Sequence, residues 1–188
     1  LMLGPPGCGK TMLARCFPTI LPDLSHDEAL EVTRIHNIAT GRHEDQVVGQ
    51  RRPFRAPHHT TSMAGMVGDR RLRPGEICLA HQGVLFLDEA TEFHRCTLET
   101  LRQPLEQGEL CLTRALGTAI YPAKFTLVLA ANPCPCGNHG SHRPCSCSAN
   151  QRKRYLAKIS GPILDRVDLH IQLENPEVMK LMVQIIFL

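Results

Sequence analysis

The sequence has little of what marks a membrane or secreted protein. No stretch approaches the roughly 20 consecutive apolar residues that a membrane-spanning helix needs. No basic leader with an apolar stretch and a cleavage site opens the chain. We therefore expect a cytoplasmic protein that is not integral to a membrane, and a reducing environment for its nine cysteines.

A large excess of charge of one sign is also missing. The formal net charge is +3, which is too small to indicate nucleic-acid binding by itself. Two basic clusters, Arg51-Arg52 and Arg152-Lys153-Arg154, are nevertheless able to contact phosphates. With 43% apolar, 21% charged and 4% aromatic residues and no tryptophan, the composition is that of a soluble globular protein.

The length of 188 residues fits one domain and is too short for a complete two-domain motor. The chain starts inside an apolar run at Leu1 and stops in another, from Leu181 to Leu188, without a helix cap or a polar finish. We expect a domain over residues 1–176, truncated at both ends, followed by an atypical apolar tail over residues 177–188.

Short apolar runs alternate with helical patterns along the chain, which favours an α/β fold. Unbroken runs suit strands that helices cover on both faces, as in a parallel sheet. The strands that we expect are Leu1–Leu3, Val84–Leu87, Phe125–Ala131 and the alternating Val167–Leu173.

Helical spacing of apolar residues separates these strands. The expected helices are residues 10–17, residues 25–38 and a segment marked by Leu98, Leu101 and Leu105 that Gly108 should end. Residues 49–75 should form a loop with short extended pieces, and residues 110–121 a β-hairpin with Gly117 near its turn.

A glycine-rich motif lies between the first strand and the first helix. It reads Gly4-Pro5-Pro6-Gly7-Cys8-Gly9-Lys10-Thr11 and satisfies G-x-x-x-x-G-K-T in the strand-loop-helix context that a phosphate-binding loop requires. Its backbone N–H groups and the helix N-terminus should hold the phosphates of ATP or GTP. Lys10 should reach the β- and γ-phosphates, and the Thr11 hydroxyl should bind magnesium.

Polar residues end the two next buried strands. Asp88 and Glu89 follow Val84–Leu87, so Asp88 is expected to hold the magnesium shell and Glu89 to polarise the attacking water. Asn132 ends the neighbouring strand, which would place its amide beside the γ-phosphate or the water. A solvated turn is the alternative for each of these positions.

Four cysteines fall close together after Asn132. Cys134, Cys136, Cys145 and Cys147 bracket a loop that also holds His139 and His142. In a reducing compartment such a cluster favours a metal site over disulfides, with zinc as the default. An iron–sulfur cluster and free thiols are the alternatives. His58 and His59 are adjacent and should point to opposite faces of a strand.

Taken in order, these motifs resemble the magnesium-chelatase-like AAA+ ATPases, and most closely the ComM and YifB branch of that family. The matching stretches cover the chain from Leu1 to about Pro176. They are Arg55-Ala56-Pro57-His58-His59-Thr60, Arg73-Pro74-Gly75-Glu76-Ile77, Leu79-Ala80-His81, Gly83 to Glu89, Leu101 to Glu106, Asn132 to Gly137 and Ser160 to Asp168.

The resemblance implies a P-loop AAA+ core with a parallel sheet, flanking helices and inserted β-hairpins. It also implies a hexameric ring that hydrolyses ATP, and in the ComM branch DNA helicase and branch-migration activity during natural transformation. Arg166 is implied as the arginine finger offered to the neighbouring subunit, and the 110–121 hairpin with Arg114 as a candidate DNA contact. The family's C-terminal lid has no match here, so we expect a lid-less core.

Two other functions stay open at this point. One is the task of magnesium chelatase subunit I, which inserts magnesium into a porphyrin with partner subunits. The other is a catalytically incompetent fragment that only binds nucleotide or zinc. The cysteine-rich loop and the Ala56-Pro57-His58-His59 segment favour the ComM branch over the chelatases.

Overall fold

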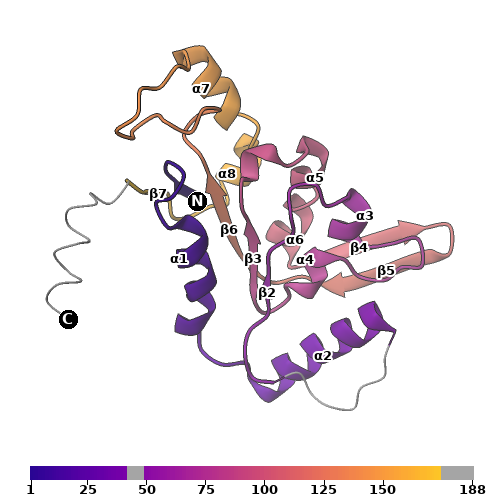
Figure 1. Cartoon of the computed structure of the whole chain (residues 1–188). Coiled ribbons are helices and arrows are strands. Elements are labelled where there is room, and N and C mark those ends of the chain that lie inside the picture. The colour runs from indigo at the N-terminus through magenta and orange to yellow at the C-terminus, as the bar shows by residue number, and fades with distance from the viewer. Residues whose placement is uncertain (42–48, 175–188) are drawn as a thin grey trace, which may run out of the picture.

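The computed structural model describes residues 1–41 and 49–174. Its centre is a five-stranded sheet in the order β2-β3-β6-β1-β7 (Figure 1). Every neighbouring pair is parallel. The strands are β1 (Met2–Leu3), β2 (Phe54–Arg55), β3 (Val84–Leu87), β6 (Thr126–Ala131) and β7 (Ile171–Gln172). Because all of them run the same way, their carboxyl ends meet at one edge of the sheet.

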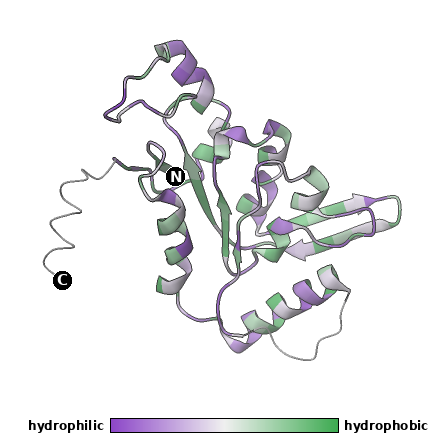
Figure 2. Cartoon of the chain, viewed as in Figure 1, coloured by the Kyte–Doolittle hydropathy of each residue, from purple (hydrophilic) through white to green (hydrophobic). Residues whose placement is uncertain are grey.

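Both faces of this sheet are covered, as the unbroken apolar runs predicted. All four residues of β3 are buried. On one face, Phe86 packs with Ala14 of the first helix; on the other, Leu85 and Leu87 join the larger core with Leu129 of β6. The central strands are correspondingly hydrophobic in Figure 2. The predicted α/β class, with a parallel sheet between helices, is confirmed.

The first two helices end where the sequence indicated. Helix α1 (Lys10–Cys16) passes at Phe17 into a 3₁₀ turn, η1 (Phe17–Ile20), because Pro18 cannot continue an α-helix. Helix α2 (His26–Thr40) begins at a capping box, in which Ser25 and Glu28 bond to each other's backbone N–H. It ends at Gly41, whose φ of 68° suits a residue without a side chain.

Two regions differ from the sequence prediction. The segment 49–75 contains not only the short strand β2 but also a helix, α3 (Met63–Val67), that its polar composition hid. The single helix expected up to Gly108 is two, α5 (Arg95–Glu99) and α6 (Arg102–Gln107). Pro104 explains the break, because it has no N–H to bond to the carbonyl four residues earlier. The remaining short helical elements here are α4 (Glu76–Leu79) and η2 (Ala90–Glu92).

The predicted hairpin is present as β4 (Glu109–Arg114) and β5 (Gly117–Pro122), which pair in antiparallel register. It projects from the side of the molecule opposite α1 (Figure 1). Near its tip Leu116 is 74% exposed. The side chain of Arg114, at the end of β4, is held in place because its guanidinium donates to the Gly68 carbonyl at 3.2 Å.

The C-terminal part of the domain contains α7 (Ala149–Leu156), α8 (Gly161–Leu164) and β7. The last strand is shorter than the predicted Val167–Leu173, because Val167 lies in a turn that closes α8 and donates its N–H to Leu164. The predicted tail, residues 177–188, lies outside the described residues. Over the described ranges, no helix combines the length and the apolar character that crossing a membrane requires.

Candidate nucleotide and metal sites

The glycine-rich loop lies at the carboxyl edge of the sheet, between β1 and α1. Gly7 and Gly9 have φ angles of 81° and 85°, which glycine adopts without strain. Gly4 has a different requirement, because a Cβ there would lie 2.6 Å from the Leu173 carbonyl oxygen. The Gly4 N–H also donates to the Ala131 carbonyl at 3.2 Å, which fixes the loop against the end of β6.

Lys10 extends along this loop and is buried, with only 8% of the residue's surface exposed. Its ammonium donates to the carbonyls of Gly4 at 2.6 Å and Pro5 at 2.9 Å. A third contact, at 3.3 Å, reaches Asn132 Oδ1 at the end of β6. The structure therefore brings Lys10 and Asn132 together across 122 positions of sequence.

Thr11 and Asp88 meet in the same way. The Thr11 hydroxyl donates to Asp88 Oδ2 at 2.7 Å, which joins the first turn of α1 to the end of β3. A hydroxyl and a carboxylate oxygen are ligands of the type that Mg²⁺ binds beside nucleotide phosphates. This donor pair fits a magnesium ion next to the phosphate-binding loop.

Glu89 follows Asp88 in an unusual backbone conformation. Its φ of 50° and ψ of 46° are left-handed, a region that a non-glycine residue enters at a cost and that is often associated with function. Its N–H donates to Asp88 Oδ1 at 2.9 Å. The carboxylate is 54% exposed and lies 3.4 Å from His59 Nδ1. The backbone of Glu89 is therefore held in place by Asp88, while its side chain is accessible to solvent.

Two cavities flank the phosphate-binding loop. One, of about 220 Å³, lies against Thr11, Asp88 and Glu89 and is closed by Arg15 and by residues 56–59. The other, of about 320 Å³, lies against Gly4 and Pro5 and is closed by residues from the cysteine loop, α7 and the end of β7. Together they offer space on both sides of the loop.

A bidentate ion pair between Arg55 and Glu76 holds the segment 56–59, which closes the first cavity. Arg55 donates through Nε and Nη2 to the two carboxylate oxygens of Glu76, each at 2.6 Å. These bonds raise the pKa of Arg55 above its ordinary value. The expected orientation of His58 and His59 was wrong: both lie beyond the end of β2, and their rings face each other with centroids 4.0 Å apart.

Sequence reasoning missed Arg15 and His59 as residues of the site. Arg15 lies one helical turn after Thr11, and that spacing was the available signal. The role of His59 depends on a chain fold that brings it to Glu89, which no local pattern shows. By contrast, two members of the predicted basic cluster, Arg152 and Lys153, do line the second cavity.

The four clustered cysteines converge. Their ligand atoms all lie within 4.8 Å of one another. Cys134 Sγ is 3.4 Å from Cys136 Sγ and 3.7 Å from Cys145 Sγ. The pKa of the Cys136 thiol is lowered to about 6, chiefly because the backbone N–H of Asn138 is directed at its sulfur. All nine cysteines of the chain are free thiols in the structure.

Arg166 lies apart from these groups. Its guanidinium donates to Glu106 Oε1 at 2.5 Å and to the Pro162 carbonyl at 3.2 Å. The side chain is 36% exposed. The structure therefore brings Lys10, Thr11, Asp88, Glu89 and Asn132 to one edge of the sheet, and it does not bring Arg166 to them.

Comparison with known proteins places this arrangement in context. The family described as magnesium chelatase, subunit ChlI, matches residues 1–181. An uncharacterized protein of Mycobacterium tuberculosis strain H37Rv is 53% identical over 177 residues, which are 93% of this chain and 35% of that protein. Protein YifB of Escherichia coli K12 is 48% identical over 94% of this chain and 35% of its own length. Competence protein ComM of Haemophilus influenzae is 48% identical over 92% of this chain and 34% of its own length.

Among solved structures, a cryo-EM reconstruction of the complex between subunits BchI and BchD of magnesium chelatase superposes with a TM-score of 0.65. The superposition covers 100% of this chain and 57% of the matched chain in that complex, and the two are 20% identical in sequence. At that identity the likeness shows a shared fold. The chain spans about a third of the length of the curated relatives that it matches.

Proposed function

Since this chain belongs to the magnesium chelatase subunit ChlI family, we propose that it is the nucleotide-binding core of an AAA+ ATPase, over residues 1–176. One observation carries the proposal. Beside a glycine-lined loop, Lys10 bonds to Asn132 and the adjacent Thr11 bonds to Asp88, so that three distant parts of the chain meet there. Such a set at the carboxyl edge of the sheet suits a bound triphosphate.

In the proposed site, residues 4–11 bind the phosphates of ATP through their backbone N–H groups. Lys10 leaves the carbonyls of Gly4 and Pro5 and binds the β- and γ-phosphates, while Thr11 and Asp88 hold Mg²⁺. A metal bound there would neutralise charge on the phosphates. Glu89 orients and polarises the attacking water, and the Asn132 amide holds that water or the γ-phosphate in place.

The proposal extends to a ring of identical subunits, most simply a hexamer, that does mechanical work on DNA. Support comes from the 48% identity to a protein named for competence, compared with 20% to the BchI–BchD chain. The projecting β4-β5 hairpin and the basic residues Arg152 and Lys153 offer surfaces for a phosphate backbone. Insertion of magnesium into a porphyrin is the second candidate, which the shared fold supports.

Turnover of ATP by the intact gene product, with and without branched DNA, distinguishes these functions. We expect branched DNA to stimulate hydrolysis, and to do so less at high salt because phosphate contacts release counterions. The measurement is phosphate release at several salt concentrations. Stimulation by magnesium chelatase partner subunits, with none by DNA, would assign the porphyrin task instead. An absence of ATP binding by the folded protein would leave only the incompetent fragment.

Replacing Lys10 tests the phosphate contacts directly. We expect Lys10→Ala to lower ATP turnover by roughly 10²- to 10³-fold, the usual cost of removing one donor to a developing charge. The matched control is Lys124→Ala, since Lys124 precedes β6 and lies at the opposite end of that strand from Asn132. It should turn over ATP at the normal rate. Normal turnover by Lys10→Ala would show that the assigned phosphate contacts are wrong.

We also propose that Cys134, Cys136, Cys145 and Cys147 bind one zinc ion. Four thiolates in a tetrahedron with Zn–S bonds of about 2.3 Å lie about 3.8 Å apart. The sulfur separations among Cys134, Cys136 and Cys145 are 3.4, 3.7 and 3.7 Å, close to that value. The sulfur of Cys147 lies within 4.8 Å of the other three. A disulfide requires about 2.05 Å, so these thiols are spaced for a shared metal. One zinc per chain, measured by elemental analysis, is the expected result.

A further inference from the structure

We propose that the cysteine loop, residues 132–148, is a metal-dependent wall of the nucleotide site, so that zinc binding and nucleotide binding strengthen each other. The inference rests on the proposed function and extends it from two separate sites to one coupled unit. Three contacts connect this loop to the phosphate-binding loop and its surroundings.

The first contact is at the start of the loop. Asn132 follows β6, and its amide oxygen lies 3.3 Å from the Lys10 ammonium. Cys134, two residues later, is fully buried. Only Pro133 therefore separates the residue that contacts Lys10 from the first of the four cysteines. Any movement of Cys134 is transmitted through one proline to the polar group beside the phosphates.

The second contact is between the loop and the phosphate-binding loop itself. Gly137 has a φ of 76°, and a Cβ built on it would lie 3.0 Å from the Cγ and Cδ atoms of Pro6. The backbone around Gly137 therefore rests on the ring of Pro6. Gly137 follows Cys136 directly, so a second cysteine is also anchored next to the phosphate-binding loop.

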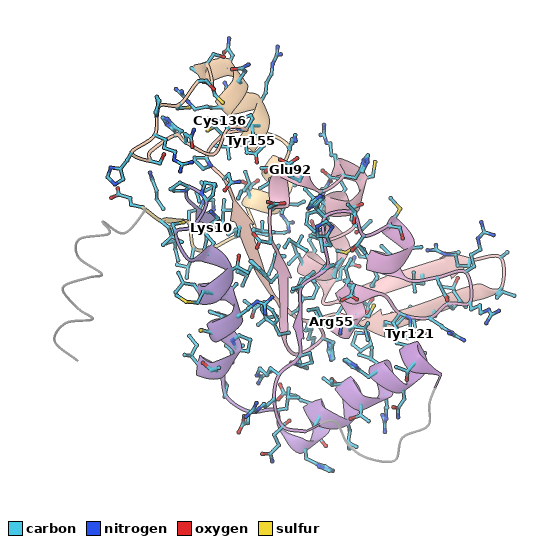
Figure 3. The ribbon with its side chains drawn as sticks, viewed as in Figure 1. Lys10, Arg55, Glu92, Tyr121, Cys136 and Tyr155 are labelled. Carbon is cyan, nitrogen blue, oxygen red and sulfur yellow. The ribbon has the colours of Figure 1, made fainter. Side chains whose placement is uncertain are left out.

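The third contact is the cavity beside Gly4 and Pro5. Pro133, His139 and Gly140 of the loop form one wall of this space of about 320 Å³. Another wall comes from α7, whose N-cap is Ser148, the residue after Cys147. Arg152 of α7 donates to the Cys147 carbonyl at 2.9 Å. In Figure 3, Cys136 lies beyond the end of β6 and next to α7, while Lys10 lies at the start of α1.

Besides the four cysteines, hydrogen bonds within turns hold the loop together, such as that from the Ser141 hydroxyl to the Asn138 carbonyl at 2.8 Å. Residues 132–148 form no helix or strand, and within 134–147 only Cys134 and Gly137 are buried. Loops of this length without secondary structure are uncommon in compact domains and lack the apolar burial that offsets their entropy. A metal bound to four thiolates closes the loop at both ends, and its binding free energy becomes folding free energy for this segment.

Coupling between two sites is reciprocal and typically amounts to roughly 5- to 150-fold in affinity. We therefore expect zinc removal to weaken the binding of Mg-ADP by a factor in that range. By the same thermodynamic cycle, saturating Mg-ADP should raise the affinity for zinc by an equal factor. The two factors are measured independently, so their agreement is itself a test.

The experiment uses the intact gene product as purified, with its zinc content measured by elemental analysis. Zinc is removed with a nitrogen-donor chelator, which prefers zinc to magnesium, and Mg²⁺ is kept in excess. Binding of a fluorescent ADP is then measured before removal, after removal and after zinc is restored. We expect the affinity to fall on removal and to recover on restoration.

Variants separate metal loss from misfolding. Cys145→Ser should lose zinc and bind Mg-ADP more weakly, whereas Cys145→His keeps a zinc ligand and should retain both. The matched control is Cys111→Ser on the exposed surface of β4, which should change neither measurement. Far-ultraviolet circular dichroism establishes that each variant keeps its secondary structure.

The outcomes assign each failure to one claim. One zinc per chain with an unchanged ADP affinity after its removal would overturn the coupling and leave both sites standing. If the purified protein contains no zinc and the Cys145→Ser variant binds ADP with normal affinity, the proposal of a metal-dependent wall is overturned altogether. A zinc-loaded, folded protein that binds no adenine nucleotide would contradict the proposed function, and the coupling with it.

Discussion

Arg166→Ala is expected to reduce ATP turnover by about a thousandfold or more while leaving nucleotide binding nearly unchanged. An arginine supplied across a subunit interface stabilises charge on the γ-phosphate in the transition state and contributes roughly 10³- to 10⁵-fold in rate. Within the chain, Arg166 contacts Glu106 and the Pro162 carbonyl, and the groups around Lys10 lie elsewhere. That separation agrees with a role toward a neighbouring subunit's nucleotide.

A mixing experiment distinguishes this role from a structural one. Arg166→Ala chains have an intact nucleotide site, and Lys10→Ala chains have an intact Arg166. If Arg166 acts across the interface, an equimolar mixture of the two inactive proteins should recover part of the turnover. Failure to recover any turnover in a mixture that forms rings would contradict the assignment.

Glu106→Gln is the matched control for Arg166. It removes the partner that holds the guanidinium at 2.5 Å but leaves the arginine itself. An exposed ion pair of this kind contributes roughly 0–1 kcal/mol to stability. The variant should therefore fold normally and keep most of its turnover. A loss of turnover as large as that of Arg166→Ala would indicate that turnover depends on the Arg166–Glu106 ion pair and not on an arginine available to a neighbouring subunit.

Glu89→Gln is the second change from which we expect a large effect. The glutamine amide cannot accept a proton from the attacking water, and the usual contribution of such a base is roughly 10²- to 10⁴-fold in rate. Binding of Mg-ATP should persist, because Asp88 and Thr11 still supply the magnesium ligands. The two measurements are single-turnover hydrolysis and ATP affinity, and they should diverge.

Glu92→Gln provides the comparison for Glu89. Glu92 lies three residues later on the surface, where its carboxylate is 3.5 Å from the Lys158 ammonium. The same chemical change there should leave the rate within about twofold, because an exposed pair contributes little. Equal losses from both variants would point to a general effect of charge at this edge, and would remove Glu89 from the role of base.

The structure explains why the local parts of the site could be recognised. A phosphate-binding loop depends on glycines, a lysine and a threonine within eight consecutive positions, so its signature is complete in the sequence. The acids after β3 and the asparagine after β6 were recognisable because buried parallel strands give unbroken apolar runs. One misjudged element was the helix before Gly108, which a single residue, Pro104 in the first turn of α6, divides into two.

The sequence by itself determined the fold class and the family, and it predicted a phosphate-binding loop, because each of these depends on patterns between near neighbours. Only the tertiary structure decided which side chains meet. Thr11 and Asp88 bond across 77 positions and Lys10 and Asn132 across 122, and such contacts depend on how the strands are ordered in the sheet. The same is true of the four thiols and of Gly137 on Pro6, since a loop without secondary structure has no periodicity that would reveal what it touches.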